Sequence, residues 1–217
     1  MSHASASEVE HTGTFWVLDL DRPIMSSSPA RLPVKLQRVG PEHAEELAAA
    51  MGVASPAVIL ERFARGCQCY VVYLNEGKIL ASYGWVSFDQ EEIGELGIRI
   101  RLSAGRAYIW DCATLPPYRG QRLYPALLIY IARVLQRQGL RRLWIGADAN
   151  NTASRRGIEV AGFQAVADVT RIAVSRTKTR YLLRRRPGVS EEVLQDLRQS
   201  LPPTVELVAP EDESRSA

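Results

Sequence analysis

The sequence contains few cysteines and histidines, and their spacing argues against disulfides and metal sites. Its three cysteines, Cys67, Cys69 and Cys112, are odd in number and follow no framework spacing, which is typical of free thiols in a reducing compartment. Cys67 and Cys69 lie too close together for an ordinary zinc knuckle, and the three histidines are scattered along the chain. We therefore expect no metal in the protein.

The sequence also shows neither the pattern of a signal peptide nor that of a membrane-spanning helix. The first residues, MSHASASEVEH, lack the basic region and the apolar stretch of a signal peptide. The longest apolar run, residues 126–132, is too short to cross a bilayer. The expectation is a soluble, cytoplasmic protein without a membrane partner.

Charge of one sign is not in large excess, because 27 basic residues face 24 acidic ones and the net charge is +3. Lysine is scarce: only Lys35, Lys78 and Lys178 are present, and the other basic residues are arginines. No dense basic stripe is interleaved with aromatic residues, so nucleic acid is not an expected partner. A nucleic-acid-binding protein is an alternative that the arginine content motivates, and salt-sensitive binding to DNA or RNA would support it.

What the chain does contain is the composition of a globular domain, with 46% apolar and 24% charged residues. Residues 1–32 are expected to be an N-terminal flank, partly disordered, with a short strand at residues 15–18 and a linker at residues 26–29. The compact domain is predicted over residues 33–187. A C-terminal helix and an acidic tail follow over residues 188–217.

Hydrophobic periodicity and turn residues predict an α+β domain with a mixed sheet. An antiparallel meander comes first, with two helices after its first strand. One βαβ unit follows, in which a helix crosses over between parallel strands. A short helix and a hairpin close the domain. The expected strands are residues 34–39, 69–74, 78–88, 95–102, 106–114, 143–147, 165–174 and 179–185, and the expected helices start near residues 41, 56, 123 and 152.

Between the last meander strand and the crossover helix lies the turn Thr114-Leu-Pro-Pro-Tyr-Arg-Gly-Gln-Arg-Leu-Tyr124. Gly120 permits a tight bend and a close approach to a ligand. The N–H groups from about Gly120 to Tyr124 are expected to lack partners in the first helical turn, and Arg119 and Arg122 add positive charge. The turn can therefore hold an anion such as a pyrophosphate; a capped helix with surface arginines is the alternative. The turn matches neither the P-loop nor the dinucleotide-binding glycine pattern.

Two motifs in this region resemble those of the GNAT superfamily of acyl-CoA-dependent N-acyltransferases. The first family pattern, a strand followed by V-x-P-x-Y-R-G-x-G-x-G/A, is matched at Pro116, Tyr118, Arg119 and Gly120. The second, N-x-x-A/S followed by G-F, is matched at Asn151, Ser154, Gly162 and Phe163. The order of the expected elements over about residues 34–186 also resembles the family.

The resemblance implies transfer of an acetyl or another acyl group from acyl-CoA to a primary amine of a small molecule or a protein. It implies acyl-CoA contacts at Thr114, Leu115, Arg119, Gly120, Gln121, Arg122, Leu123, Tyr124, Asn151 and Ser154. A backbone N–H near Thr114 or Leu115 would stabilise the thioester oxygen. Asp111 would serve as the general base or hold a water that does. A structural contact to a neighbouring loop is the alternative for Asp111, and a helix N-cap is the alternative for Asn151.

The chain departs from the family pattern at three positions. Arg122 and Tyr124 replace small residues of the loop and would crowd the cofactor. The tyrosine that often protonates the departing thiolate would fall at position 158, where this chain has Ile158. Tyr124 is a substitute candidate, with core packing as its other role. These departures motivate a second function: a GNAT-fold module that binds acyl-CoA without turnover. Neither the acceptor nor the oligomeric state follows from the sequence, although Glu95 with Glu91 and Glu92 could attract a cationic amine or be solvated.

Overall fold

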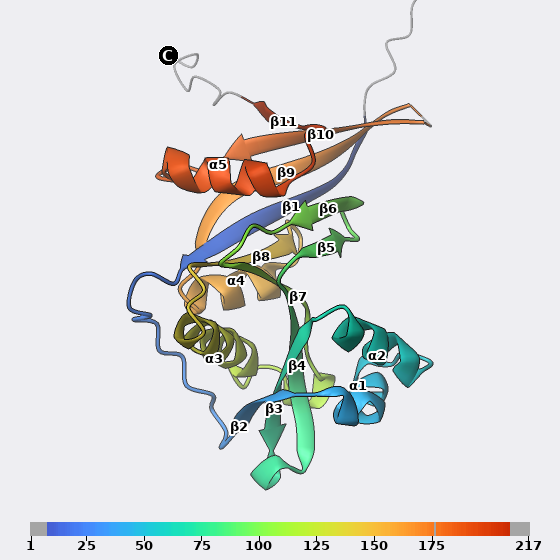
Figure 1. Cartoon of the computed structure of the whole chain (residues 1–217), viewed down its shortest axis with the longest axis vertical. Coiled ribbons are helices and arrows are strands. Elements are labelled where there is room, and N and C mark those ends of the chain that lie inside the picture. Colours follow the sequence, from blue (N-terminus) through green and yellow to red (C-terminus); the bar gives the residue numbers. More distant parts are fainter. Residues whose placement is uncertain (1–7, 176, 209–217) are drawn as a thin grey trace, which may run out of the picture.

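The computed structural model describes residues 8–175 and 177–208, and a nine-stranded mixed sheet forms its centre (Figure 1). The strands lie in the order β11-β10-β9-β1-β8-β7-β4-β3-β2. Their bounds are Glu8–Asp19 (β1), Lys35–Val39 (β2), Gln68–Leu74 (β3), Ile79–Ser87 (β4), Arg106–Thr114 (β7), Arg142–Asp148 (β8), Gln164–Ser175 (β9), Lys178–Arg185 (β10) and Val205–Val208 (β11). A separate two-stranded sheet pairs Gln90–Ile93 (β5) with Ile98–Arg101 (β6).

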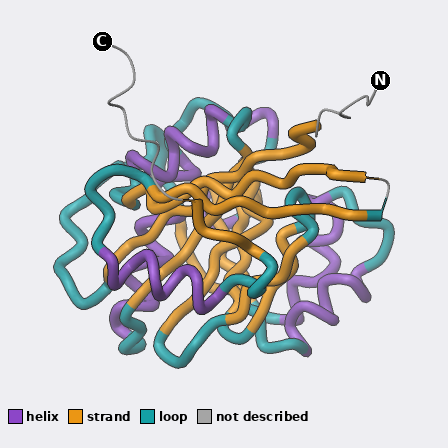
Figure 2. Tube along the Cα trace, turned by 90° about the horizontal axis from the view of Figure 1, so that it is seen from above, coloured by secondary structure: helices purple, strands orange, loops and turns teal. Residues whose placement is uncertain are grey.

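Helices cover both faces of the sheet, as the view from above shows (Figure 2). Their bounds are Ala44–Met51 (α1), Pro56–Ala64 (α2), Leu123–Arg137 (α3), Thr152–Val160 (α4) and Glu191–Ser200 (α5). None of the helices in the described ranges has the length and apolar character to cross a membrane. The predicted α+β architecture is confirmed: β2, β3, β4 and β7 form the meander, β7-α3-β8 is the parallel crossover unit, and β9-β10 is the closing hairpin.

The long helix α3 forms where the apolar spacing predicts it. Leu127, Ile131 and Leu135 are fully buried on one side of the helix, at the spacing of successive turns. The helix ends before Gly139, whose φ of 83° is the left-handed conformation that closes many helices. Local sequence therefore sets both the length of this helix and the face it buries.

Alternation along the strands builds a different apolar layer on each face of the sheet. Trp16, Ile109 and Ile145 pack with α3 in one cluster. Their strand neighbours, among them Phe15 and Tyr108, point the other way, into a cluster with α5 and the β5–β6 hairpin. A third cluster on that second face joins α1 and α2 to β3 and β4. The first face thus carries α3 and α4, and the second carries the remaining helices and the hairpin.

The N-terminal strand is longer than predicted and forms part of the central sheet. A strand of four residues was expected in a flank, whereas β1 spans 12 residues and lies between β8 and β9, antiparallel to both. Phe15, Trp16 and Val17 are buried on alternating faces. The strand therefore lies inside the sheet. Its local sequence does not indicate that β8 and β9 are its neighbours.

Two further elements differ from the expectation. The predicted strand over residues 95–102 is instead the second half of a hairpin, because residues 94–97 turn back and Leu96 N–H donates to Ile93 O at 3.1 Å. The expected acidic tail contains β11, which pairs in parallel with β10. The rest of the predicted acidic tail, residues 209–217, lies outside the described residues.

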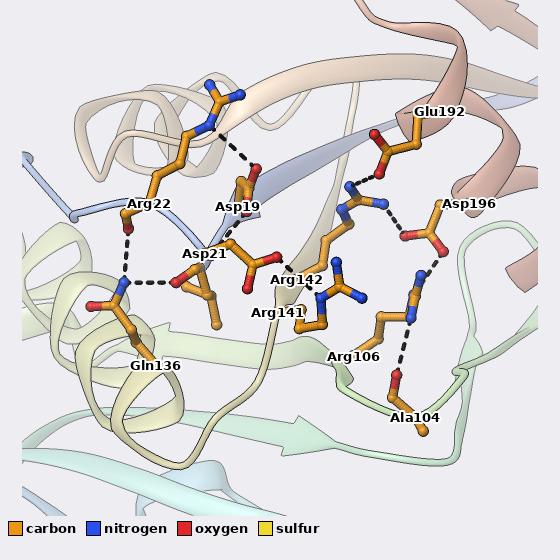
Figure 3. Close-up of polar contacts among 11 residues, drawn as sticks. Asp19, Asp21, Arg22, Ala104, Arg106, Gln136, Arg141, Arg142, Glu192 and Asp196 are labelled. Atoms are coloured by element: carbon orange, nitrogen blue, oxygen red, sulfur yellow. Dashed lines mark hydrogen bonds and ion pairs between the residues drawn. The ribbon is translucent and has the colours of Figure 1, made fainter.

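The end of the sheet at the start of β7 and β8 is fastened by charged side chains (Figure 3). Asp196 of α5 accepts from Arg106 Nε at 2.7 Å and from Arg142 Nη1 at 2.5 Å, and Arg142 also donates to Glu192 at 2.9 Å. Burial alone would lower the pKa of Arg142, but the bonds to Asp196 and Glu192 reverse this effect and raise it. The network thereby fixes α5 across the paired part of β7 and β8.

Candidate active site

The sheet opens between β7 and β8. The two strands pair in parallel from Arg106 opposite Arg142 to Ile109 opposite Ile145, and no pairing continues beyond that point. Each strand keeps its outer neighbour, since β7 stays paired with β4 to Thr114 and β8 stays paired with β1 to Asp148. A register shift against β4 and a φ of 42° at Asp111 mark a bulge in β7. The result is a fork in the middle of the sheet.

The predicted anion-binding turn lies between the open end of β7 and α3. Gly120 and Arg122 adopt left-handed φ angles of 76° and 57°, and α3 begins at the next residue, Leu123. Within the described part of the chain, the N–H groups of residues 120–124 donate no hydrogen bond. Consecutive free N–H groups at the start of a helix fit a pyrophosphate.

Arg31 holds the other side of this turn. Its N–H donates to Gln121 O at 2.9 Å, and its guanidinium donates to Gly120 O at 3.3 Å. Because the carbonyl groups are held on one side, the N–H groups of the turn are presented on the other. This contact was not predicted, because it joins segments that are far apart in the chain.

The side chains of the loop arginines differ in their contacts. Arg119 Nε donates to Thr114 O at 3.2 Å, so this side chain braces the turn against the end of β7. Arg122 is exposed and is the N-cap residue of α3. Both side chains lie at the surface beside the free N–H groups, where they add positive charge to the predicted anion site.

Tyr124 connects α3 to α4. Its hydroxyl lies 3.1 Å from Ser154 Oγ, and its ring fills the space beside Gly157, where a Cβ atom would approach ring carbon Cδ1 to 2.5 Å. Burial raises the pKa of Tyr124, so the hydroxyl keeps its proton at neutral pH. Ile158 is fully buried in the core. Gly157, which the motifs did not single out, is therefore required for the position of the tyrosine.

Asn151 caps α4: its side-chain oxygen accepts from Ser154 N–H at 3.0 Å. The N-cap alternative from the sequence is therefore confirmed, and a contact to acyl-CoA stays a prediction for both residues. The hydroxyl of Ser154 points to Tyr124 instead. These bonds fix the start of α4 against the start of α3.

Of the two candidate oxyanion donors, Leu115 is already engaged, since its N–H donates to Ala81 O at 2.9 Å. Successive N–H groups of a strand point to opposite edges. The N–H of Thr114 therefore points away from β4, toward the fork. Of the two candidates, Thr114 is therefore the one whose N–H faces the fork, and its role as an oxyanion donor stays a prediction.

Asp111 is held by a cation that the sequence did not reveal. Arg62 of α2 donates to its carboxylate at 2.5 Å. The guanidinium of Arg62 also lies over the rings of Trp110 and Trp85, with 4.6 and 5.1 Å to the ring centroids. Asp111 thus contacts a helix rather than a loop. The predicted role of Asp111 as a base stays a prediction, and its carboxylate is engaged by Arg62.

A small cavity of about 40 Å³ lies at the fork on the face opposite α3 and α4. Its lining comes from β1, the β5–β6 hairpin, β7 and β8, and includes the polar residues His11, Glu95, Tyr108 and Asp148. His11 Nε2 lies against the carboxylate of Asp148. This site was not predicted, because His11 and Asp148 are far apart in the chain and come together only when β1 pairs with β8.

Comparisons with known proteins agree with this geometry. A family model described as "Acetyltransferase (GNAT) family" matches residues 41–163, which include the open part of β7, the turn, α3, β8 and α4. No curated protein sequence matches the chain.

Many solved structures are similar in fold, and two of them serve as examples. A GCN5-related N-acetyltransferase from Sphaerobacter thermophilus is 15% identical with a TM-score of 0.55, over 75% of this chain and 50% of that chain. A GNAT-family acetyltransferase from Colwellia psychrerythraea is 18% identical with a TM-score of 0.50, over 77% of this chain and 56% of that chain. The chain therefore spans about half the length of these proteins.

Proposed function

The chain belongs to the GNAT family of acetyltransferases, and on that premise we propose that it transfers an acetyl group from acetyl-CoA to a primary amine of a small molecule or a protein. The family implies acyl-CoA as the co-substrate. The observation that supports the proposal most is the run of free N–H groups over residues 120–124 beside the fork between β7 and β8.

In the proposed arrangement, the pyrophosphate of acetyl-CoA binds the N–H groups of the turn, and the thioester enters the fork. Arg119 and Arg122 add charge at the same place. The N–H of Thr114 donates to the thioester oxygen as negative charge develops there. The amine nitrogen forms a bond to the carbonyl carbon, the carbon–sulfur bond breaks, the amine gives up a proton, and the thiolate gains one.

Tyr124 is proposed to donate a hydrogen bond to the departing thiolate. Its raised pKa keeps the phenol protonated throughout the neutral range, so a donor is always available. The same raised pKa disfavours complete proton transfer to sulfur, so the thiolate takes its proton from solvent. Tyr124 thereby takes the place of the tyrosine that Ile158 replaces.

Amine-dependent release of CoA thiol tests the proposed function. We expect the protein with acetyl-CoA and an accepted primary amine to release thiol in equal amount to the acetylated amine, measured with a thiol reagent and by mass spectrometry. Tight binding of acetyl-CoA without thiol release across a broad panel of small amines and peptides would instead support the non-catalytic module.

Replacement of Tyr124 by phenylalanine tests the role of its hydroxyl. We expect Tyr124→Phe to lower kcat about tenfold with unchanged affinity for acetyl-CoA, because a hydrogen bond to a charged group contributes ~1.5 kcal/mol. The ring that packs on Gly157 is kept. Tyr130→Phe is the matched control, since Tyr130 lies on the same helix and its ring packs edge-on against Tyr70. Equal kcat values for the two variants would assign Tyr124 to packing alone.

A further inference from the structure

We propose that the cavity at the fork receives the amino group of the acceptor, that this acceptor is a primary amine at the end of an unbranched alkyl chain, and that His11 removes its proton. The inference deepens the proposed function and rests on it. It is carried by the position, the size and the charge of the cavity, and by the contact between His11 and Asp148.

The cavity lies where the two strands begin to separate. Tyr108 is one residue before the last paired residue of β7, and Gly146 is the first residue of β8 beyond the pairing. Both line the cavity, and a Cβ atom on Gly146 would approach the Tyr108 hydroxyl to 2.9 Å. Glycine at this position leaves room for the phenol at the fork itself. An amine in the cavity is therefore next to the place where the thioester is proposed to lie.

The volume of the cavity restricts what can enter. About 40 Å³ is more than the roughly 10–15 Å³ that one water requires, and far less than a ring would need. An ammonium group with one or two methylenes fits this space. A branched carbon next to nitrogen, or an amine on a sugar or aromatic ring, does not. The rest of the acceptor remains outside.

The charges around the cavity favour a cation. Asp148 faces it from β8 and Glu95 from the hairpin, while Tyr108 faces it from β7. Arg171 of β9 lies opposite His11 in the strand register. Two carboxylates in the lining attract an ammonium group and repel the carboxylate of a free amino acid.

The contact with Asp148 orients the His11 ring, as a carboxylate does for a histidine that acts as a general base. Its Nε2 contacts the Asp148 carboxylate, and the two side chains are 29% and 19% exposed, so water surrounds neither of them. No described residue forms a hydrogen bond with Nδ1 of His11, and this nitrogen is the proposed proton acceptor. The proton moves from the ammonium nitrogen to Nδ1, and Asp148 stabilises the imidazolium that forms. The freed nitrogen lone pair then attacks the thioester. Asp148 acts here as a positioning residue.

The acceptor class is tested with two amines of equal composition, n-propylamine and isopropylamine. We expect n-propylamine to have a kcat/KM at least about tenfold higher, because the pocket that fits the unbranched chain excludes the branch. Similar values for the two amines, with thiol release in both cases, would leave the proposed function standing and overturn the inference.

His11→Asn tests the proton acceptor, with His43→Asn as the matched control, because His43 lies outside the cavity beside Glu42. We expect His11→Asn to lower kcat/KM for n-propylamine about 100-fold at neutral pH, and His43→Asn to leave it unchanged. The deficit should shrink above about pH 10, where the amine has lost its proton in solution. Asp148→Asn should show a smaller deficit with the same pH dependence. A deficit that is constant with pH would assign His11 to structure and overturn its role as a base.

A binding measurement separates this inference from the proposed function. In the protein saturated with CoA, we expect n-propylammonium to shift the NMR signals of the His11 ring and not those of His43, and isopropylammonium to shift neither. This result in the absence of thiol release would refute the proposed function and keep the cavity as an amine site. Unshifted His11 signals would overturn the inference whether or not thiol is released.

Discussion

Gly120→Asp should weaken CoA binding by about 1,000-fold, because it replaces a close approach to several N–H donors by a carboxylate beside the pyrophosphate. Gly120 adopts a φ of 76°, and a Cβ atom at this position would meet no atom within 4 Å. The substitution is therefore strained only through its backbone, at a cost of about 1 kcal/mol, and the variant should fold. We expect CoA to raise the Tm of the wild-type protein and to leave that of the variant unchanged.

Gly139→Asp is the matched control for this experiment. Gly139 has a φ of 83°, has equally open surroundings, and lies at the far end of the same helix. Its aspartate should cost a similar amount of stability while the CoA-induced Tm shift is retained. If Gly120→Asp folds and still responds to CoA like Gly139→Asp, the turn is not the pyrophosphate site.

Asp196→Ala should lower the free energy of unfolding by ~3–5 kcal/mol, because it removes the buried carboxylate that binds Arg106 and leaves Arg142 with only the exposed Glu192. The Asp196 carboxylate is 5% exposed and binds both Arg106 and Arg142, which are 24% and 11% exposed (Figure 3). The variant would leave two largely buried guanidinium groups facing a void. We expect the Tm to fall by roughly 10 °C.

Glu192→Ala provides the comparison within the same network. Its carboxylate contacts the same Arg142 but is 80% exposed, so its removal should cost less than about 1 kcal/mol. Urea unfolding of the two variants with equal m-values would measure the difference directly. Equal losses of unfolding free energy for Asp196→Ala and Glu192→Ala would show that the burial of the Asp196 carboxylate does not strengthen its contribution to stability.

The features that were predicted correctly are those that depend on residues close together in the sequence. The apolar stripe of α3, the glycine after its end and the proline-rich turn before it depend on neighbouring residues only. The same holds for Asn151, whose cap of α4 is a bond across three residues. The predicted free N–H groups over residues 120–124 follow from the geometry of a helix start, which any chain with this turn would share.

The parts that were not predicted depend on partners far apart in the chain. β1 lies between β8 and β9, and its own residues do not indicate which two strands it will pair with. The Arg62 contact to Asp111 and the His11 contact to Asp148 each join separate elements. The hairpin at residues 90–101 was missed because the alternation of β6 already begins at Leu96 inside the turn, and β5 contributes only one apolar residue, Ile93. Asp111 was predicted to act as a base, and its ion pair with Arg62 was not predicted.

The two faces of the sheet have different roles in this account. The turn, α3 and α4 on one face are proposed to hold acetyl-CoA, and the cavity under the hairpin on the other is proposed to receive the amine. The fork between β7 and β8 is the passage between them. β1 supplies His11 to one face and buries Trp16 in the other, so an unpredicted strand is central to the site.

A crystal structure of the protein with acetyl-CoA would show where the cofactor lies relative to the turn and the fork. We predict the pyrophosphate on the N–H groups of residues 120–124, the thioester in the fork between β7 and β8, and its oxygen within hydrogen-bond distance of Thr114 N–H. A pyrophosphate bound away from this turn, or a thioester outside the fork, would contradict this prediction.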